Sequence, residues 1–341
     1  MDWEKKKYEI DKKLDGRFKR GIGLASSFRG VSLGAEGVDA AGIEVKLEVD
    51  GSAVIEAGIA DMGQGARTIL VQVIAEELGI PMEKITILPY DTSRVPDSGP
   101  TVASRATLMG GKAAQEAARK IKEILLDVAK KIFSTHDVKF EKGFFISKKG
   151  KIPLKEVAER AYEMGKSLNA IGWFKAPSIT WDEERGKGEP YFTYVYGTQV
   201  AEVEVDTYTG KVKVLNVIAA HEVGKAINPA MAKGQIYGGV MMALGYALLE
   251  EFEIKNGIPR IVNFDEYLIP TASDIPNINA ILVEHPDPVG PYGAKSLGEP
   301  TNELLAPAIA NAVYNATGRR VRELPLTLEQ VFLGRKLEKD R

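Results

Sequence analysis

The same order of local patterns occurs twice in this chain of 341 residues, and it limits the folds that the chain can adopt. In each half, alternating apolar residues flank a turn that contains glycine, and a Gly-Gln pair then leads to apolar residues at helical spacing. The turns are Asp50-Gly51 and Thr209-Gly210, and the pairs are Gly63-Gln64 and Gly234-Gln235. Alternation with a period of two predicts a β-hairpin, whereas apolar residues three and four positions apart predict a helix. The sequence therefore predicts an internal duplication of a β-β-α unit.

Strand and helix patterns are mixed along the chain and do not alternate strictly. This order favours an α+β fold made of tandem, duplicated two-layer α/β units with mixed sheets. A doubly wound, Rossmann-like domain is the alternative, but Gly21-x-Gly23 precedes no helical pattern and lacks the third glycine of that fingerprint. We expect a charged lead-in over 1–20, a first α+β unit over 21–175 and a second one over 190–341.

Apolar spacing also predicts the main helices, a short strand over 84–88 and a long polar loop over 89–105. The predicted helices lie over 69–78, 110–133, 236–249 and 303–316, the last with Thr301-Asn302-Glu303 as its capping start. Gly79 is expected to end the first of these helices and Gly318 the last. The segment 135–190 is less regular. The loop over 89–105 is long for a compact domain, and such a length is typical of a functional or disordered segment.

The amino-acid composition narrows the chemistry. The sequence contains no cysteine, so this chain cannot provide a disulfide, a thiol nucleophile, a Cys-ligated zinc or an iron–sulfur cluster. The three histidines, His136, His221 and His285, are far apart and lack ligand spacing, so we predict no metal held by protein side chains. Redox chemistry would therefore need a cofactor that brings its own metal ligands, and another chain to take the electrons.

Charge and hydropathy bear on partners and location. The net charge is −2, which offers no electrostatic basis for binding nucleic acid or an acidic membrane surface. There is no apolar run of ~18 residues that could span a bilayer. The first residues also lack the apolar core of a signal peptide, so the expected location is the cytoplasm.

Glu299 lies between a glycine and a proline, directly before an apolar helical pattern. Glycine permits close backbone approach, and proline restricts both its own φ and the residue before it. A carboxylate on such a stiff turn suits a general base, although a purely structural turn has the same pattern.

Two further groups of residues have two interpretations each. The amides of Gln64 and Gln235 suit a polar or anionic ligand beside a helix N-terminus. Alternatively, Gln64 caps its own backbone at the start of a helix, and Gln235 is a buried amide satisfied by the neighbouring strand. The loop over 98–107 combines hydroxyls, flexible backbone and Arg105, which suit phosphate, and solvated loop chemistry explains the same residues.

Taken in order, these segments resemble the molybdenum subunit of the xanthine dehydrogenase/aldehyde oxidase family of molybdenum hydroxylases. The resemblance extends from about residue 21 to about residue 333. It is carried by Met62-Gly63-Gln64-Gly65, Pro100-Thr101-Val102-Ala103-Ser104-Arg105, Gly234-Gln235-Ile236-Tyr237-Gly238-Gly239 and Gly298-Glu299-Pro300. It implies a molybdopterin cofactor, commonly the cytosine dinucleotide form in prokaryotes, whose dithiolene rather than a protein side chain holds molybdenum.

The resemblance also implies roles for individual residues. Glu299 matches the family's glutamate beside molybdenum, which acts as a general base so that an oxygen derived from water attacks an electron-poor carbon. The cofactor-binding residues that it implies are Gly63, Gln64, Gly65, Thr101, Ala103, Ser104, Arg105, Gly234 and Gln235. Among them, Ser104 and Arg105 are expected to contact the pterin or the dinucleotide phosphates.

The chain resembles only the C-terminal half of such a subunit, as a natural split subunit or as a fragment. We therefore expect a companion chain with the N-terminal half, an iron–sulfur subunit and, as in many family members, a flavin (FAD) subunit. The substrate would be a small aldehyde, purine or other N-heterocycle, and the residues that would choose among these lie largely in the missing half. Two alternatives remain, namely a non-catalytic molybdopterin carrier and a plain structural subunit.

Overall fold

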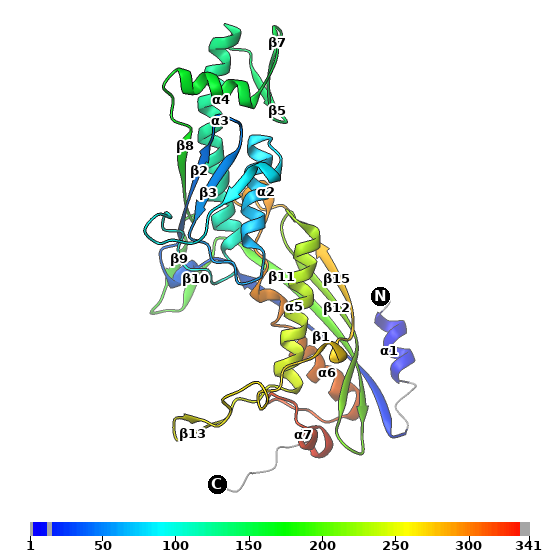
Figure 1. The fold of residues 1–341 in the computed structure, drawn as a ribbon. Coiled ribbons are helices and arrows are strands. Elements are labelled where there is room, and N and C mark those ends of the chain that lie inside the picture. Colours follow the sequence, from blue (N-terminus) through cyan, green and yellow to red (C-terminus); the bar gives the residue numbers. More distant parts are fainter. Residues whose placement is uncertain (1–2, 12–15, 335–341) are drawn as a thin grey trace.

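The computed structural model describes residues 3–11 and 16–334. Its two largest sheets have four strands each, and helices pack on both (Figure 1). The first sheet has the order β4-β3-β2-β8, and the second has the order β1-β11-β12-β15. Both contain parallel and antiparallel neighbours, which confirms the predicted α+β fold with mixed sheets. In the part of the chain that is described, no helix combines the length and the apolar character needed to cross a membrane.

The first sheet is built around the predicted hairpin. Its strands are β2 (Ala40–Leu47), β3 (Ala53–Ala57), β4 (Ile85–Ile87) and β8 (Asn169–Lys175). Helix α3 (Gly111–Phe133) packs on β2 and β8, and α2 (Ala66–Leu78) packs on α3 and β4. Alternate residues of β2 and β3 are fully buried, as period-two alternation requires when one sheet face meets a core. Gly79 ends α2 in the left-handed conformation, as its position in the sequence predicted.

The second sheet repeats this arrangement. Its strands are β1 (Phe18–Gly30), β11 (Tyr194–Asp206), β12 (Val212–Glu222) and β15 (Asn277–Val283). Helix α6 (Leu305–Thr317) packs on β1 and β11, and α5 (Pro229–Leu248) packs on α6 and β15. The hairpins β2–β3 and β11–β12 correspond, and each second strand has a parallel neighbour, β4 or β15. The duplication predicted from the sequence is therefore present in the topology.

The outer strand β1 differs in origin from its counterpart β8. Strand β8 comes late in the first half of the chain, whereas β1 comes from the start of the chain and pairs along its whole length with β11. Residues 18–30 therefore belong to the sheet of the second half, although 21–30 were expected in the first unit. The division at 21–175 and 190–341 otherwise stays a proposal.

The glycines of β1 have a packing role. A Cβ atom at Gly21 would lie 2.0 Å from the carbonyl oxygen of Ala312, and one at Gly23 would lie 2.1 Å from that of Ala308. Helix α6 can approach β1 this closely only because these positions lack side chains. Gly172 of β8 has the same relation to α3, with a Cβ to Ala113 O distance of 1.9 Å.

Several local expectations were wrong. The segment 135–190 is regular, because it contains a three-stranded sheet, helix α4 and the hairpin β9–β10 in addition to β8. The bounds are β5 (Lys139–Glu141), β6 (Phe144–Ser147), β7 (Gly150–Pro153), α4 (Leu154–Glu163), β9 (Thr180–Asp182) and β10 (Lys187–Glu189). Short strands with little alternation leave no clear period in the sequence.

The remaining elements lie outside the two main sheets. Helices α1 (Trp3–Asp11) and α7 (Leu328–Leu333) flank the second sheet, and β13 (Ile254–Lys255) and β14 (Ile258–Pro259) form a small hairpin on a projecting arm, residues 249–270 (Figure 1). Thr301 does not cap α6, because α6 begins at Leu305 and has no side-chain cap. The Thr301 hydroxyl instead donates to the carbonyl of Gly298 at 2.7 Å, within a 3₁₀ turn over Glu299–Thr301.

Candidate active site

All four sequence segments that were singled out meet at one cavity of about 600 Å³ between the two sheets. Its wall contains residues from the loop before α2, the loop over 101–107, helix α5 and the turn at Glu299. Among the predicted site residues, those that line it are Gln64, Thr101, Ser104, Arg105, Gln235 and Glu299. Gly63, Gly65, Ala103 and Gly234 are their immediate neighbours in the sequence. Segments as far apart in the chain as Met62 and Glu299 therefore form a single site.

The loop before α2 is organised by Asp61, which the sequence analysis did not single out. Its carboxylate accepts the backbone N–H groups of Gly63, Gly65 and Arg67, each at 3.0 Å. Burial alone would raise the pKa of Asp61, but these backbone hydrogen bonds hold it below its ordinary value. Asp61 therefore satisfies the free N–H groups at the start of α2, a role that the sequence analysis had considered for Gln64.

The side chain of Gln64 bonds to its own loop. Its Nε2 donates to Ala60 O at 2.8 Å, and its Oε1 accepts from Met62 N at 2.6 Å. Gly65 has a φ of +84°, and a Cβ atom there would lie 1.8 Å from Cε of Met231 on α5. The glycine thus permits both the left-handed turn and the close packing of this loop on the second unit.

Gln235 lies in the second turn of α5, not at its N-terminus as expected, since α5 begins at Pro229. Asn228 caps the helix by accepting from Met231 N at 3.1 Å. The Nε2 group of Gln235 donates to Gln64 O at 3.4 Å, so the two Gly-Gln pairs are in contact. Its amide oxygen has no hydrogen-bond partner among residues 3–11 and 16–334 and remains available to a ligand at the cavity wall.

The loop over 101–105 has a constrained backbone. Ala103 and Ser104 both have positive φ, +50° and +48°, which costs about 1–3 kcal/mol for each non-glycine residue. Thr101 Oγ1 accepts from Ala60 N at 2.9 Å, and Ala103 O accepts from Ser32 N at 2.9 Å. These bonds hold the loop so that the Ser104 hydroxyl meets Glu299 from the other unit.

Arg105 does not present its guanidinium to the cavity, although phosphate binding was expected of it. The side chain is fully buried, and its Nε and Nη2 atoms contact Asp39 at 2.8 and 2.7 Å. Its remaining hydrogen bonds go to the carbonyls of Ser98, Pro100 and Ala40. Because every guanidinium nitrogen is occupied, Arg105 holds the loop together in this structure, and no donor is left for a phosphate.

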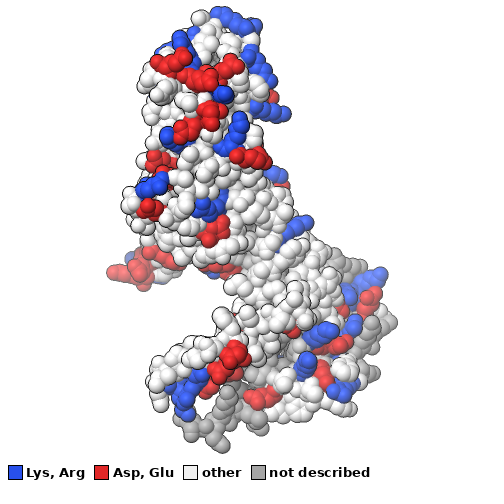
Figure 2. Space-filling view, in the orientation of Figure 1, with Lys and Arg blue, Asp and Glu red and all other residues white. Residues whose placement is uncertain are grey.

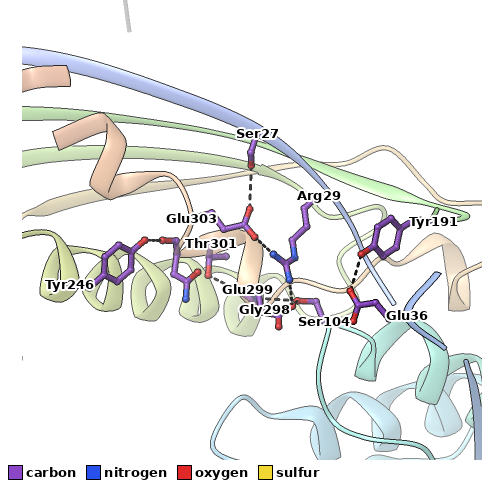
Figure 3. Close-up of polar contacts among 11 residues, drawn as sticks. Ser27, Arg29, Glu36, Ser104, Tyr191, Tyr246, Gly298, Glu299, Thr301 and Glu303 are labelled. Carbon is purple, nitrogen blue, oxygen red and sulfur yellow. Dashed lines mark hydrogen bonds and ion pairs between the residues drawn. The ribbon is translucent and has the colours of Figure 1, made fainter. Parts of the chain in front are cut away.

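Glu299 is held at one of its two carboxylate oxygens (Figure 3). Its Oε2 accepts from Ser104 Oγ at 3.0 Å and from Arg29 Nη2 at 3.1 Å, and its backbone N–H donates to Ser104 Oγ at 3.0 Å. Oε1 makes no hydrogen bond or ion pair within the described residues, and the side chain is 43% exposed at the cavity wall. The turn is further held by Gln199, whose Nε2 donates to Thr301 O at 2.7 Å. One oxygen is therefore anchored while the other is accessible.

Arg29 is the main site residue that the sequence analysis missed. It lies at the end of β1, and its guanidinium forms ion pairs with Glu299 and Glu303. Burial would lower the pKa of Arg29, but the charges of these two glutamates raise it above its ordinary value. No local pattern could reveal this contact, because Arg29 and Glu299 are 270 residues apart in the sequence.

Lys295 supports the segment that leads to Glu299. It is buried, and its ammonium group contacts Glu222 Oε2 at 2.9 Å and Tyr194 O at 2.7 Å. The neighbouring Ser296 accepts from Leu108 N at 3.0 Å. A buried lysine is stable only if its charge is paired and hydrogen-bonded, and both conditions hold here. The contacts of Lys295 to Glu222 on β12 and Tyr194 on β11 therefore fix the segment that leads to Glu299.

The donor set fits a cofactor that brings its own metal ligands. Within the described residues no group of three or more His, Cys, Asp or Glu gathers to hold a metal ion. The cavity instead offers uncharged amides and hydroxyls and an apolar wall that includes Ile69 and Met231. It also offers one oxygen each of Gln235 and Glu299 that no other described residue binds. Amides, hydroxyls and backbone N–H groups suit the ring edge of a pterin and its anionic side chain.

Comparison with known proteins identifies the family. A sequence model of the molybdopterin cofactor-binding domain matches residues 1–276, which is most of the chain. The xanthine dehydrogenase molybdenum-binding subunit of Escherichia coli O157:H7 is 31% identical over 97% of this chain. The chain therefore belongs to the molybdopterin cofactor-binding domain family.

Solved structures agree with this assignment. The aldehyde oxidoreductase from Desulfovibrio desulfuricans ATCC 27774 is 31% identical and superimposes with a TM-score of 0.81, over 97% of this chain and 34% of that one. The CO dehydrogenase from Oligotropha carboxidovorans is 26% identical with a TM-score of 0.84, over 97% of this chain and 42% of that one. This chain spans less than half the length of these relatives, including 44% of the E. coli subunit.

Proposed function

We propose that this chain is the part of a molybdenum hydroxylase that carries the catalytic base, and that it acts on an aldehyde, a purine or another N-heterocycle. The observation that carries the proposal is the meeting of all four motif segments around one cavity, with the accessible oxygen of Glu299 on its wall. The molybdenum-binding subunits and aldehyde oxidoreductases that the chain resembles support this class of reaction.

The proposed cofactor is molybdopterin with molybdenum, in the cytosine dinucleotide form. When bound, it would supply a two-electron redox centre whose metal is held by the sulfur atoms of the pterin. We assign its binding to Gln64, Gln235, Thr101, Ser104 and the backbone around them, namely Gly63, Gly65, Ala103 and Gly234. Arg105 would contribute through its backbone and through the shape of its loop, since its side chain is occupied.

Glu299 would act as the general base through Oε1. A base of this kind typically contributes a rate factor of ~10²–10⁴. The bonds to Oε2 leave Oε1 to accept a proton from the oxygen that attacks the substrate, so that the orientation of the carboxylate is set before substrate arrives. The apolar wall of the cavity would exclude water around this oxygen and strengthen its interactions.

A companion polypeptide would complete the cavity. The support comes from α5, which contains a single charged residue, Lys233, in its 20 residues. One face of α5 is buried in the core, while Tyr237 and Met242 on the other face are 42% and 60% exposed. A helix that is apolar all round is normally buried on all sides, so we infer that the exposed face of α5 is covered in the functional assembly.

The shape of the molecule supports the same inference. Figure 2 shows a hollow between the first unit and the arm (249–270), and the surface around this hollow carries few charged residues. Phe252 and Phe264 on the arm are 56% and 78% exposed. The occupant would be the part of the relatives that this chain does not span. Iron–sulfur clusters, which this cysteine-free chain cannot bind, and FAD would belong to further partner chains.

Molybdenum and pterin content tests this proposal directly. The chain is purified alone and together with its native neighbours from cells that make the cofactor, and both samples are analysed for metal and pterin. About one molybdenum per chain in the complex, with little in the isolated chain, is the expected result. Absence of molybdenum and pterin from both samples would refute the proposed function.

A further inference from the structure

We propose that Arg29 is the positioning residue for the Glu299 carboxylate, and that Glu303 acts on this carboxylate through Arg29. The inference rests on the proposed function for its catalytic consequence, because Glu299 is the base in that proposal. Its structural content, the control of one carboxylate by one guanidinium, can be measured without turnover.

The guanidinium of Arg29 lies between two carboxylates (Figure 3). Its Nη1 forms an ion pair with Glu303 Oε1, and its Nη2 donates to Glu299 Oε2 at 3.1 Å. Ser27, two residues earlier on β1, donates to Glu303 Oε2 at 3.4 Å. Glu303 is thus held at both oxygens by β1, and it fixes the end of the arginine that reaches Glu299.

Two donors from different parts of the fold then define the orientation of Glu299. Arg29 comes from the outer strand of the second sheet, and Ser104 comes from the strained loop of the first unit. Both bind the same oxygen, Oε2, so rotation of the carboxylate would break two charge-assisted hydrogen bonds at once. Oε1 is thereby left without a partner among the described residues, on a side chain that lines the cavity, which is the arrangement that a general base needs.

The charges at this point favour the same role. Glu299 and Glu303 are close like charges that share one cation, so loss of Arg29 would leave them to repel each other. The Nε atom of Arg29 is buried and has no hydrogen-bond partner within the described residues. Buried donors are normally hydrogen-bonded, so an arginine with a purely structural role would be expected to bond through Nε as well. In Arg29 both terminal nitrogens bind carboxylates, while Nε stays without a partner among the described residues.

Arg20 provides a matched control on the same strand. Its side chain is 38% exposed, as is that of Arg29, and it also contacts two glutamates, Glu202 at 3.9 Å and Glu204 at 3.3 Å. Neither of these glutamates lines the cavity. Arg20→Gln therefore removes a comparable ion pair from β1 without touching Glu299.

The first experiment observes the carboxylate in the isolated chain by NMR. Glutamate carboxyl groups are labelled with ¹³C, and the Glu299 signal is assigned by its loss in Glu299→Gln. We expect this signal to be displaced in Arg29→Gln, to return toward the wild-type position in Arg29→Lys, and to be unchanged in Arg20→Gln. A Glu299 signal that Arg29→Gln leaves in place would overturn the inference.

The second experiment measures turnover in the assembled, molybdenum-loaded complex, with benzaldehyde and hypoxanthine as probes and dichlorophenolindophenol as electron acceptor. Arg29→Gln should lower kcat by at least about tenfold, because misplacement of a reacting group has a large effect on rate. KM should change by less than about threefold, since the substrate is still bound. Glu303→Gln should lower kcat in the wild type and add nothing in the Arg29→Gln background.

The outcomes separate this inference from the proposed function. Normal turnover by Glu299→Gln contradicts the proposed base, and the NMR displacement then still decides whether Arg29 positions this carboxylate. Loss of turnover by Glu299→Gln with normal kcat in Arg29→Gln contradicts the positioning role alone. Additive effects of Arg29→Gln and Glu303→Gln would show that Glu303 acts independently of Arg29.

Discussion

Replacement of Arg105 by methionine should destabilise the chain even when no cofactor is bound. Arg105 and Asp39 form an ion pair in which the side chains are 1% and 2% exposed. Methionine keeps most of the side-chain volume, but it leaves the Asp39 carboxylate buried without its cation. The carbonyls of Ser98 and Pro100 also lose their donor.

The expected loss follows from the burial of this pair. Removal of one partner from a buried ion pair typically costs about 3–5 kcal/mol, because the remaining charge is uncompensated. In a cooperative unit of 150–250 residues, each kcal/mol lowers the melting temperature by roughly 2–4 °C. Arg105→Met should therefore lower the melting temperature of the first unit by roughly 6–20 °C, measured by calorimetry on the cofactor-free chain.

Arg94 offers a control near the same loop. It forms an ion pair with Glu56 at 2.7 Å, but its side chain is 50% exposed. Exposed pairs contribute about 0–1 kcal/mol, so Arg94→Met should shift the melting temperature by only a few degrees at most. If Arg105→Met melts like the wild type and only cofactor content falls, the reasoning is wrong and Arg105 is a ligand of the cofactor rather than a support for its loop.

Three further predictions concern the base, pH and assembly. Glu299→Gln should keep the molybdenum content of the complex and lower kcat by about 10²–10⁴-fold; normal turnover in a molybdenum-replete sample would contradict this role. Burial lowers the pKa of His221 to about 4, so the folded state favours the neutral imidazole. The folding stability that this preference contributes is complete above pH ~6.5 and is lost as the pH falls toward 4. The shift corresponds to about 3 kcal/mol of folding free energy. Urea unfolding should therefore show a smaller loss of stability for His221→Gln than for the wild type between pH ~6.5 and pH ~4. An equal dependence of stability on pH in the variant and the wild type would refute this role of His221. Met242→Glu should abolish co-purification with the companion polypeptide, whereas Tyr162→Glu, at an even more exposed position on α4, should not; retention of the companion by Met242→Glu would exclude this face of α5 as the contact.

The elements of the two units could be predicted because their signals are local. Alternation on either side of Asp50-Gly51 and of Thr209-Gly210 identifies both hairpins, and left-handed glycines at 79 and 318 end α2 and α6 as predicted. Each of these features depends on residues a few positions apart. The order of the strands within each sheet depends on contacts between distant segments, and β1 shows the limit of local reasoning.

The sequence by itself determined the list of candidate residues and the family, because motif identity and order do not require coordinates. Glu299 was recognised from its glycine and proline neighbours, and Gln64 and Gln235 from their repeated context. The tertiary structure alone decided how these residues are used. In the structure, Asp39 and backbone carbonyls bind the Arg105 guanidinium, and Arg29 contacts Glu299, which is 270 positions away in the sequence. The physical reason is that burial and pairing depend on which groups meet in space. The pairing of β1 with β11, for example, places Arg29 in the second sheet, far in sequence from the residues it contacts.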